Sequence, residues 1–444
     1  MSRAGHVVVV GAGASGCLLA ILLRTRGMAV TLVDLPVRPR GDSVEAIPEP
    51  AIRLLSELGL LEATRRAGAV PVRGFDNAWD ERAVRVAEGW FLHVEREALA
   101  ASLRAEAMSR GAALRQGRAG PLREETHGVR ADVAGEIIKG DAAVDATGRA
   151  AFFGRPVRHA TPFTACLFDA PGSAVPGRGR VVRVGEGAAY RLDHPGRCTA
   201  AAVYPSAAEP PGVRVVARAL GLEGAELVQS GYRAASVQWS SAPVRGRTIA
   251  VGDAALAYDP VAGQGIRFAL QSALAAAAVL DTWRRGSGFA GPMPSIAAEY
   301  YRDLIDGARA RHERSLARLR GGPDQDERSP DIDIAPGDWV EFCGSSRRAG
   351  LVEAGFVVER EAWVLADGGL VRYLGSLDLA LLRDLATRPR RASDLCAELC
   401  ALGVSDAAAR SAIRFCASRG LMARVGGDEL PRAARRGPAP HLPR

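Results

Sequence analysis

The chain has 444 residues, of which 48% are hydrophobic and 24% charged, with 50 glycines and 26 prolines. These proportions exclude a disordered, collagen-like or disulfide-stapled chain, and the length predicts two or three domains with a large core. The formal net charge is +8, from 58 basic and 50 acidic residues, and Lys139 is the only lysine. Because the arginines are scattered among Asp and Glu, we expect solvated faces and no nucleic-acid partner.

Cysteine usage and hydropathy favour a cytoplasmic protein. Seven cysteines are spread without a short regular spacing, which is typical of reduced thiols. The stretch Val7–Leu23 is uncharged and resembles a signal peptide, but three glycines at dinucleotide-site spacing interrupt it. No other stretch reaches the roughly 18 apolar residues that a bilayer requires. We therefore expect a soluble protein with no membrane partner.

The amino-terminal segment has the pattern of a dinucleotide-binding unit. A β-branched run, His6–Val10, predicts a strand buried on both faces. The turn Gly11-Ala12-Gly13-Ala14-Ser15-Gly16 follows at once, and Cys17–Arg26 predicts a helix. A second strand is predicted over Ala29–Val33, and Asp34 follows it. A carboxylate at this place can accept hydrogen bonds from a ribose.

Each residue of the turn has a physical reason to be there. Gly11 permits the tight turn, Gly13 lets the backbone approach a pyrophosphate, and Gly16 lets the helix pack on the strand. Ala14 and Ser15 complete the turn, and the amino terminus of the helix that follows faces the phosphates. Strand, turn, helix, strand and acid in this order favour nucleotide binding over a tight turn without a ligand. The pattern alone does not distinguish FAD from NAD.

Two later segments bear on that choice. Phe91–Leu99 predicts a strand that leads into an amphipathic helix, with Arg96 at the helix start. Ala142–Arg149 predicts a strand and a turn that contains Thr147 and Gly148. Taken alone, Arg96 is compatible with a solvated arginine, and the second segment with an ordinary strand and turn.

A third segment is the most specific. Arg247–Ala255 predicts a strand that ends in a Gly-Asp pair, which places the Asp253 carboxylate where it can bind a ribityl hydroxyl. Pro260 and the run Gly263-Gln264-Gly265 then predict a loop that enters an alanine-rich helix over Ile266–Trp283. The dipole of that helix can stabilise negative charge on a flavin.

All four segments occur in the order found in the group A flavoprotein monooxygenases and FAD-dependent halogenases, which residues 1 to about 320 resemble. The resemblance implies FAD as the cofactor, with Arg96 contacting the flavin and Thr147 and Gly148 beside the FAD. It also implies an α/β fold class, a Rossmann-type FAD-binding domain with an inserted β-sheet substrate domain. Gly41–Pro48 resembles a loop near the flavin in halogenases, with Asp42 in place of the usual glutamate.

The inserted segment alternates between apolar and polar residues. This period of two predicts strands of a sheet with one face over the flavin. The predicted strands span Pro162–Ala170, Arg178–Val184, Ala188–Asp193 and Arg197–Tyr204.

The carboxy-terminal part predicts a separate module of α+β type. Ala362–Leu374 predicts a hairpin, and three helices are predicted over Leu377–Thr387, Ala392–Leu402 and Ser405–Arg419. This order resembles a winged helix. From Asp331 onward the sequence has 16 arginines and 15 acidic residues, so this part is nearly neutral and is expected to bind polyanions poorly. The order also resembles PqqD-like peptide-recognition domains, in which a peptide adds a strand to the hairpin edge.

Three thiols of this module, Cys396, Cys400 and Cys416, lie on neighbouring predicted helices. Because no histidine lies nearby in the sequence, buried packing is favoured over zinc, and no metal site is predicted.

The predicted domain boundaries follow from these segments. We expect the first part of the FAD-binding domain over 1–155, a substrate-domain sheet over 156–245, and the second part of the FAD-binding domain with a long helix over 246–320. A linker over 321–337, the winged-helix-like module over 338–430 and a tail over 431–444 follow.

Among the reactions of the family that the chain resembles, hydroxylation is favoured over halogenation. The tryptophan halogenases need a lysine that relays hypohalous acid and a Trp-x-Trp-x-Ile-Pro segment, whereas the chain has only Lys139 and lacks that segment. Hydroxylation needs molecular oxygen, a flavin C4a-hydroperoxide and a dry pocket. The electron donor is NAD(P)H or a separate flavin reductase, and the sequence leaves both open.

A general base and an aromatic pocket would complete such a site. Candidates for the base are His194, Asp193, Glu49 and Asp76, among which the sequence does not choose. Candidates for the pocket walls are Trp79, Trp90, Tyr190 and Trp239.

A halogenase-like flavoprotein without halogenase residues, joined to a small carboxy-terminal module, resembles the monooxygenases that mature tryptophylquinone cofactors. This resemblance implies a polypeptide substrate, docked partly by the module. The reaction would dihydroxylate a tryptophan in the small subunit of quinohemoprotein amine dehydrogenase, toward cysteine tryptophylquinone. Alternatives are a small-molecule aromatic hydroxylase, a flavin-dependent halogenase and a DNA-binding redox sensor.

Overall fold

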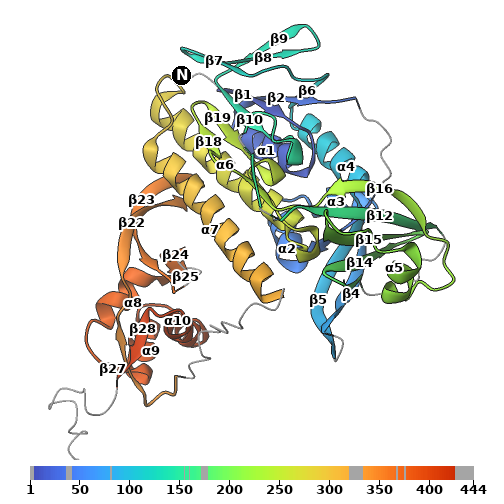
Figure 1. Cartoon of the computed structure of the whole chain (residues 1–444). Helices are drawn as coiled ribbons and strands as arrows, with labels where there is room; N and C mark the ends of the chain where they lie inside the picture. The colour runs from blue at the N-terminus through green and yellow to red at the C-terminus, as the bar shows by residue number, and fades with distance from the viewer. Residues whose placement is uncertain are drawn as a thin grey trace, which may run out of the picture. The chain divides into compact units, whose positions relative to one another are not determined.

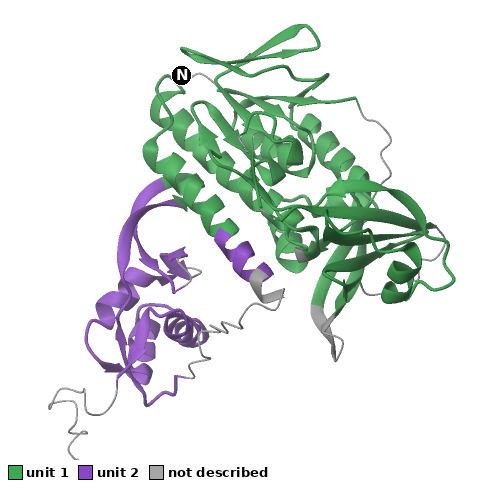
Figure 2. Ribbon diagram, viewed as in Figure 1, with its two compact units in different colours: residues 1–309, 352–357 green, residues 310–351, 358–444 purple. Residues whose placement is uncertain are grey.

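The computed structural model describes residues 5–36, 43–80, 83–154, 156–159, 161–171, 179–319, 334–366, 369–374 and 377–425. It forms two compact units, residues 1–309 with 352–357 and residues 310–351 with 358–444 (Figure 2). The boundary falls within helix α7 (Ser295–Leu319), upstream of the predicted linker. Most of that linker, the predicted tail, Gly41 and Asp42 lie outside the described residues.

A six-stranded sheet forms the centre of the first unit (Figure 1). Its central strands, β1 (His6–Val10) and β10 (Ala142–Asp145), are short β-branched or alanine runs that are buried on both faces. The pair β18–β19 is antiparallel, and the other neighbours in the sheet are parallel. In sheet order the strands are β18 (Val244–Arg245), β19 (Thr248–Ala250), β10 (Ala142–Asp145), β1 (His6–Val10), β2 (Ala29–Asp34) and β6 (Ala113–Gln116).

Different layers cover the two faces of this sheet. Val8, Val10 and Val33 pack against a three-stranded meander, β7 (Arg123–Glu125), β8 (Gly128–Val133) and β9 (Glu136–Gly140). Lys139 lies exposed on β9, in the short strand that the sequence predicts. Helix α1 packs against α4 and α6. The helices of this unit are α1 (Ala14–Thr25), α2 (Glu49–Glu57), α3 (Leu61–Arg66), α4 (Arg96–Ser109), α5 (Val213–Leu220), α6 (Gly265–Ser287) and the first part of α7.

The second sheet of this unit has eight strands, and the four strands predicted from the alternating pattern are confirmed within it. It is larger than predicted, because residues 44–95 supply three further strands that the sequence had assigned to the FAD-binding domain. The link is the parallel pairing of β4 with β13, where the Phe75 ring lies over Gly179. In sheet order the strands are β16 (Val228–Ala234), β12 (Phe163–Pro171), β15 (Arg197–Pro205), β14 (Gly187–His194), β13 (Gly179–Val184), β4 (Val70–Asp80), β5 (Ala83–Glu95) and β3 (Val44–Pro48).

The two faces of the large sheet bury different clusters. On one face, Cys166, Ala189 and Ala200 pack against Val216 and Leu220 of α5. A separate cluster contains Phe163, Ala165, Val203 and Ala235, with Tyr190 and Val261 packed against it. A small third sheet contains segments of the chain that run between the two larger sheets. Its strands are β11 (Pro156–Arg158), β17 (Gln238–Ser240) and β20 (Leu256–Ala257).

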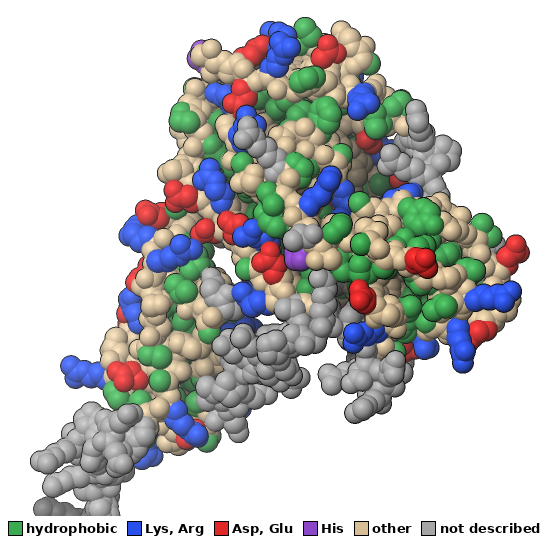
Figure 3. Space-filling model, in the orientation of Figure 1, with side chains coloured by type: hydrophobic (Ala, Val, Ile, Leu, Met, Phe, Trp, Pro, Cys, Tyr) green, Lys and Arg blue, Asp and Glu red, His purple; other side chains and the backbone are tan. Residues whose placement is uncertain are grey.

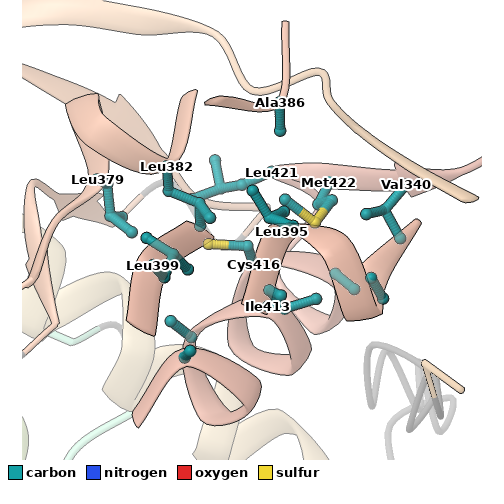
Figure 4. Packing of buried hydrophobic residues seen from close by; sticks show 14 of the residues in the cluster. Val340, Leu379, Leu382, Ala386, Leu395, Leu399, Ile413, Cys416, Leu421 and Met422 are labelled. Atoms are coloured by element: carbon teal, nitrogen blue, oxygen red, sulfur yellow. The ribbon is translucent and has the colours of Figure 1, made fainter. Parts of the chain in front are cut away.

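The second unit has its own core (Figure 4). Leu382, Leu395, Leu399 and Ile413 of three helices pack there with Val340. The predicted helices are confirmed as α8 (Leu379–Leu385), α9 (Ala392–Ala401) and α10 (Asp406–Ser418), and the predicted hairpin as β23 (Phe356–Val364) with β24 (Leu370–Val371). The end of the predicted hairpin forms a separate strand, β25 (Tyr373–Leu374). Strands that the sequence did not predict are β21 (Trp339–Phe342), β22 (Ser346–Glu353), β26 (Leu377–Asp378), β27 (Arg390–Arg391) and β28 (Met422–Arg424).

Charge and hydropathy complete the description. On the face drawn in Figure 3, basic and acidic side chains are interspersed. Within the described ranges, no helix is both long and apolar enough to cross a membrane. Cys396 and Cys416 are buried in the core of the second unit, and Cys400 is half-buried. Among the described residues, no three metal-ligating side chains are grouped together.

Candidate functional site

The turn after β1 contains two glycines that the fold requires and one that faces open space. Gly11 has a φ of +106°, and a Cβ there would lie 2.2 Å from the carbonyl oxygen of Ala146. A Cβ on Gly16 would lie 1.9 Å from the carbonyl oxygen of Gly11. At Gly13, no described heavy atom lies within 4 Å of the Cβ position. Gly11 and Gly16 therefore serve packing, whereas Gly13 leaves room for a ligand.

Helix α1 begins at Ala14, three residues before the predicted start, so Ala14 and Ser15 form its first turn. Gly13 stands at the N-cap position, and no side chain caps the helix there. The first backbone N–H groups of α1 therefore have no side-chain acceptor from the N-cap, which suits an anion such as a pyrophosphate.

Asp34 ends β2, as predicted, and meets an arginine that the sequence did not indicate. Arg104 of α4 lies 3.3 Å from the Asp34 carboxylate and donates a hydrogen bond of 3.3 Å to the carbonyl of Ala12. The Nε of Arg104 is buried without a hydrogen-bond partner among the described residues. This unpaired donor fits an acceptor on a bound nucleotide, because a buried N–H group without a partner is costly.

The turn after β10 is held by a buried carboxylate. Asp145 accepts hydrogen bonds from the backbone N–H of Thr147 (3.1 Å), the Thr147 hydroxyl (2.6 Å) and the backbone N–H of Phe153 (2.8 Å). Gly148 has a φ of +65°, and its Cβ position is open. Asp145 is therefore a structural residue that presents Thr147 and Gly148 on the surface of the turn.

The Gly-Asp pair after β19 brings this strand end close to α1. A Cβ on Gly252 would lie 2.6 Å from the Ser15 hydroxyl oxygen, and the φ of Gly252 is +58°. Its N–H donates a hydrogen bond of 2.9 Å to the Ser272 hydroxyl. Asp253 follows, with its carboxylate 3.9 Å from Nε of Arg149. Burial raises the pKa of Asp253, and the charges of Arg149 and Arg96 oppose that shift.

Arg96 stands at the start of α4, as predicted, and pairs with a carboxylate from β3. Its Nε donates a hydrogen bond of 2.5 Å to Glu45, which raises the pKa of the guanidinium. The side chain of Arg96 is nevertheless 62% exposed. Glu45 lies in the segment predicted to form a loop near the flavin, but in a strand, and it was not among the predicted site residues.

Arg149 is held more firmly than Arg96. Its two terminal nitrogens donate hydrogen bonds of 2.6 Å to the carbonyls of Ser236 and Tyr258. Burial lowers the pKa of Arg149, and Asp253 opposes that shift. The side chain therefore joins the turn after β10 to the loop before α6.

The loop before α6 matches the predicted Pro and Gly positions. Asp259 accepts a hydrogen bond of 2.9 Å from the N–H of Val261, and a short 3₁₀ turn covers Pro260–Ala262. Gly263 has a φ of +60°, and Gln264 stands at the N-cap of α6, which starts at Gly265. The Cβ positions of Gly263 and Gly265 are open. The amino terminus of this 23-residue helix is available to an anionic group.

The hydrogen-bond donors, the charged groups and the open space of these segments fit FAD. The open glycines are Gly13, Gly148, Gly263 and Gly265, one or two from each of three segments. Asp34 and Arg104 suit the ribose end, the start of α1 suits the pyrophosphate, and Asp253 suits a ribityl hydroxyl. Glu45, Arg96, Arg149 and Asp259 all act on the pKa of Tyr190, so the charged groups lie around one part of the large sheet.

Comparisons with known proteins agree with this geometry. Residues 5–147 match the model of the FAD binding domain family. Rifampicin monooxygenase of Streptomyces venezuelae is 32% identical over 150 residues, which are 32% of this chain and 31% of that protein. The chain therefore matches about a third of that relative's length.

A match over the whole length comes from a solved structure. The peptidyl tryptophan dihydroxylase QhpG, essential for tryptophylquinone cofactor biogenesis, is 26% identical, covers 94% of this chain and 99% of its own, and has a TM-score of 0.67. Residues 5–147 therefore belong to the FAD binding domain family, and the chain shares the fold of QhpG over nearly its whole length. This flavoprotein shares its fold with the flavin-dependent halogenase CmlS, at 17% identity over 97% of this chain and 98% of that one, with a TM-score of 0.76.

The residues predicted for catalysis do not form one group in this flavoprotein. The Nε2 of His194 donates a hydrogen bond of 2.9 Å to the carbonyl of Gly68, because a carbonyl oxygen can only accept. Glu49 pairs with Arg53 at 3.5 Å on the surface of α2. Asp76 lies on β4. Asp193 forms two hydrogen bonds with Arg191, at 2.8 and 2.9 Å.

The predicted pocket walls are also dispersed. Trp90 is 52% exposed, and the Arg309 guanidinium lies over the Trp239 ring at 4.9 Å. The side chain of Trp79 lies outside the described residues. Tyr190 lies among the charged groups of the candidate FAD site. The catalytic base therefore stays a prediction.

One buried histidine was missed by the sequence analysis. His93 of β5 is fully buried, and its Nδ1 lies 2.8 Å from the carbonyl of Asp193. Because a carbonyl only accepts, Nδ1 carries the proton, and Nε2 has no hydrogen-bond partner among the described residues. Burial lowers the pKa of His93, so the ring is neutral near pH 7. The aromatic contacts of His93 with Phe75 come from pairing that the sequence does not reveal.

The lowered pKa of His93 predicts a pH-dependent stability. The unfolded chain takes up the proton near pH 6.5 and the folded chain only below that, so the free energy of unfolding falls as the pH decreases from 6.5. His93→Asn keeps an N–H near the Asp193 carbonyl but does not titrate. Thermal melts between pH 8 and pH 5 should therefore show a smaller loss of Tm in the variant. Parallel curves for the two proteins would contradict a neutral His93.

Proposed function

We propose that this flavoprotein hydroxylates a tryptophan side chain of a polypeptide. The observation that carries the proposal is the likeness to QhpG over nearly the full length of both chains, including the second unit. Shorter likenesses, such as that to aklavinone-11 hydroxylase at 21% identity over 72% of this chain, concern the fold alone.

FAD, held by the residues of the candidate site, would supply the activation of molecular oxygen. The residues proposed to hold it are Gly13, Ala14, Ser15, Asp34, Arg96, Thr147, Gly148, Asp253, Pro260, Gly263, Gln264 and Gly265, to which the structure adds Arg104. Gly11 and Gly16 are proposed to act indirectly, by allowing the close packing that shapes the turn. Each hydroxylation consumes one oxygen molecule and two electrons, and places one oxygen atom on the ring and the other in water. NAD(P)H or a separate reductase would supply the electrons.

The second unit is proposed as a winged-helix-like module that docks the polypeptide. Strand β22 stands at the end of its three-stranded sheet, so its outer edge offers backbone groups to an added strand. Arg348 and Glu359 form an ion pair of 3.1 Å on this hairpin, and both are exposed. An extended polypeptide with alternating acidic and basic side chains would form ion pairs with Arg348 and Glu359.

A single-turnover experiment tests the proposed reaction. Chemically reduced holoenzyme would be mixed with oxygen and the small subunit of a quinohemoprotein amine dehydrogenase, which removes the question of the electron donor. Mass spectrometry should find one added oxygen atom per reduced flavin, located on tryptophan, and two after a second reduction. An unmodified polypeptide, with all of the oxygen recovered as hydrogen peroxide, would contradict the proposal.

A second candidate is a small-molecule aromatic hydroxylase. Its support is the 32% identity to rifampicin monooxygenase over 150 residues. The same mixture with free tryptophan and indole in place of the polypeptide separates the two functions. Oxidation of a free aromatic compound without oxidation of the polypeptide would favour this second function.

A further inference from the structure

Tyr190 occupies the middle of β14, on the face of the large sheet that is turned away from α5. Its neighbours in sequence point to the other face. Ala189 is buried in the cluster that includes α5, and Arg191 donates hydrogen bonds to carbonyls at the end of α5. Because successive side chains of a strand alternate, Tyr190 lies on the opposite face.

The surroundings of Tyr190 join the sheet to the loop before α6. Tyr190 and Val261 pack against the same cluster, in which Ala235 is fully buried. Val261 belongs to the 3₁₀ turn between Asp259 and Gly263. Strand β14 lies against this turn, so Tyr190 is the aromatic residue that β14 places near the loop before α6, which is proposed to hold FAD.

The hydroxyl of Tyr190 is surrounded by charges of both signs but has no hydrogen-bond partner among the described residues. Burial, Glu45 and Asp259 raise its pKa, and Arg96 and Arg149 lower it, with a result of about 12. The phenol is therefore protonated at neutral pH, and its O–H group can donate.

We propose that Tyr190 is the hydrogen-bond donor that the large sheet contributes where the substrate ring and the flavin meet. Oxygen transfer leaves negative charge on an oxygen atom, and a positioned O–H donor stabilises such charge. The part of this inference that concerns oxygen transfer rests on the proposed function. The position of Tyr190 beside the flavin does not depend on the substrate.

Tyr190→Phe removes only the hydroxyl, and two measurements on the holoenzyme test the proposal. A tyrosine in contact with a flavin quenches its fluorescence by electron transfer and phenylalanine does not, so the fluorescence of bound FAD should rise. The fraction of consumed oxygen that is found in the product should fall about ten-fold or more, with hydrogen peroxide in its place. FAD affinity and Tm should stay close to those of the wild type.

Tyr232→Phe is the matched control, because Tyr232 lies on the edge strand β16 of the same sheet and is 51% exposed. It should change neither measurement. Unchanged fluorescence in Tyr190→Phe would overturn the position of Tyr190, and raised fluorescence with unchanged coupling would overturn its donor role. If the wild type does not oxidise the polypeptide, the proposed function fails, and the fluorescence comparison still decides the position of Tyr190.

Discussion

Gly13→Ala is expected to weaken FAD binding about ten-fold or more and to leave the FAD-free protein folded. The added methyl group would enter the open space at the start of α1, where the pyrophosphate must approach the backbone. Gly13 has φ −77° and ψ −173°, which alanine adopts without strain. Alanine is less favourable than glycine at an N-cap, which opposes the gain from a stiffer unfolded chain, so the free energy of unfolding of the apoprotein should change by less than about 1 kcal/mol. Titration of apoprotein with FAD and thermal melts without FAD measure the two effects.

Gly16→Ala is the matched control, with the opposite result. Its methyl group would lie 1.9 Å from the carbonyl oxygen of Gly11, so α1 would have to move away from the turn. We expect a loss of several kcal/mol in the unfolding of the apoprotein, as for other overpacked sites. Equal FAD affinity in Gly13→Ala and wild type would contradict the assignment of this turn to the pyrophosphate.

Asp145→Asn is expected to lower the free energy of unfolding by about 2–4 kcal/mol, although it changes no side-chain size. Asp145 accepts three hydrogen bonds while buried, two of them from backbone N–H groups. The asparagine amide nitrogen must face one of these donors, so at least one buried N–H loses its acceptor. Denaturant unfolding of the apoprotein measures the loss.

Asp132→Asn controls for the loss of a charge. Asp132 accepts a hydrogen bond of 3.0 Å from the N–H of Gly135 in an exposed turn of the meander. Water can replace this bond, so the expected change is within about 0.5 kcal/mol. Similar losses in the two variants would contradict the structural role of Asp145.

Local patterns in the sequence predicted the parts of the fold that depend on neighbouring residues. The strand of four valines, the glycine turn and the acid after the second strand all have their predicted places. Ser405 was expected to cap the last helix, and its hydroxyl accepts a hydrogen bond from the N–H of Ala408. Periodicity and capping act over a few residues, which is why a single sequence reveals them.

Pairing between distant segments was not predictable in the same way. Strand β4 pairs with β13, about 100 residues later in the chain, and no local pattern in either strand indicates which strand it pairs with. The same limit applies to the candidate site, where Arg104 meets Asp34 and Glu45 meets Arg96 across sequence separations of 70 and 51 residues. An arginine on an amphipathic helix has the same sequence pattern whether it faces water or a carboxylate.

The exposed position of Lys139 on the meander has a practical consequence for measuring binding. Because this chain has one lysine, a reagent that reacts with amines can attach only there and at the terminal amine. A protein coupled through Lys139 would be immobilised by the edge strand β9 of the meander, in a nearly uniform orientation. Surface-based measurements of FAD and polypeptide binding could then compare variants without substitutions made only for attachment.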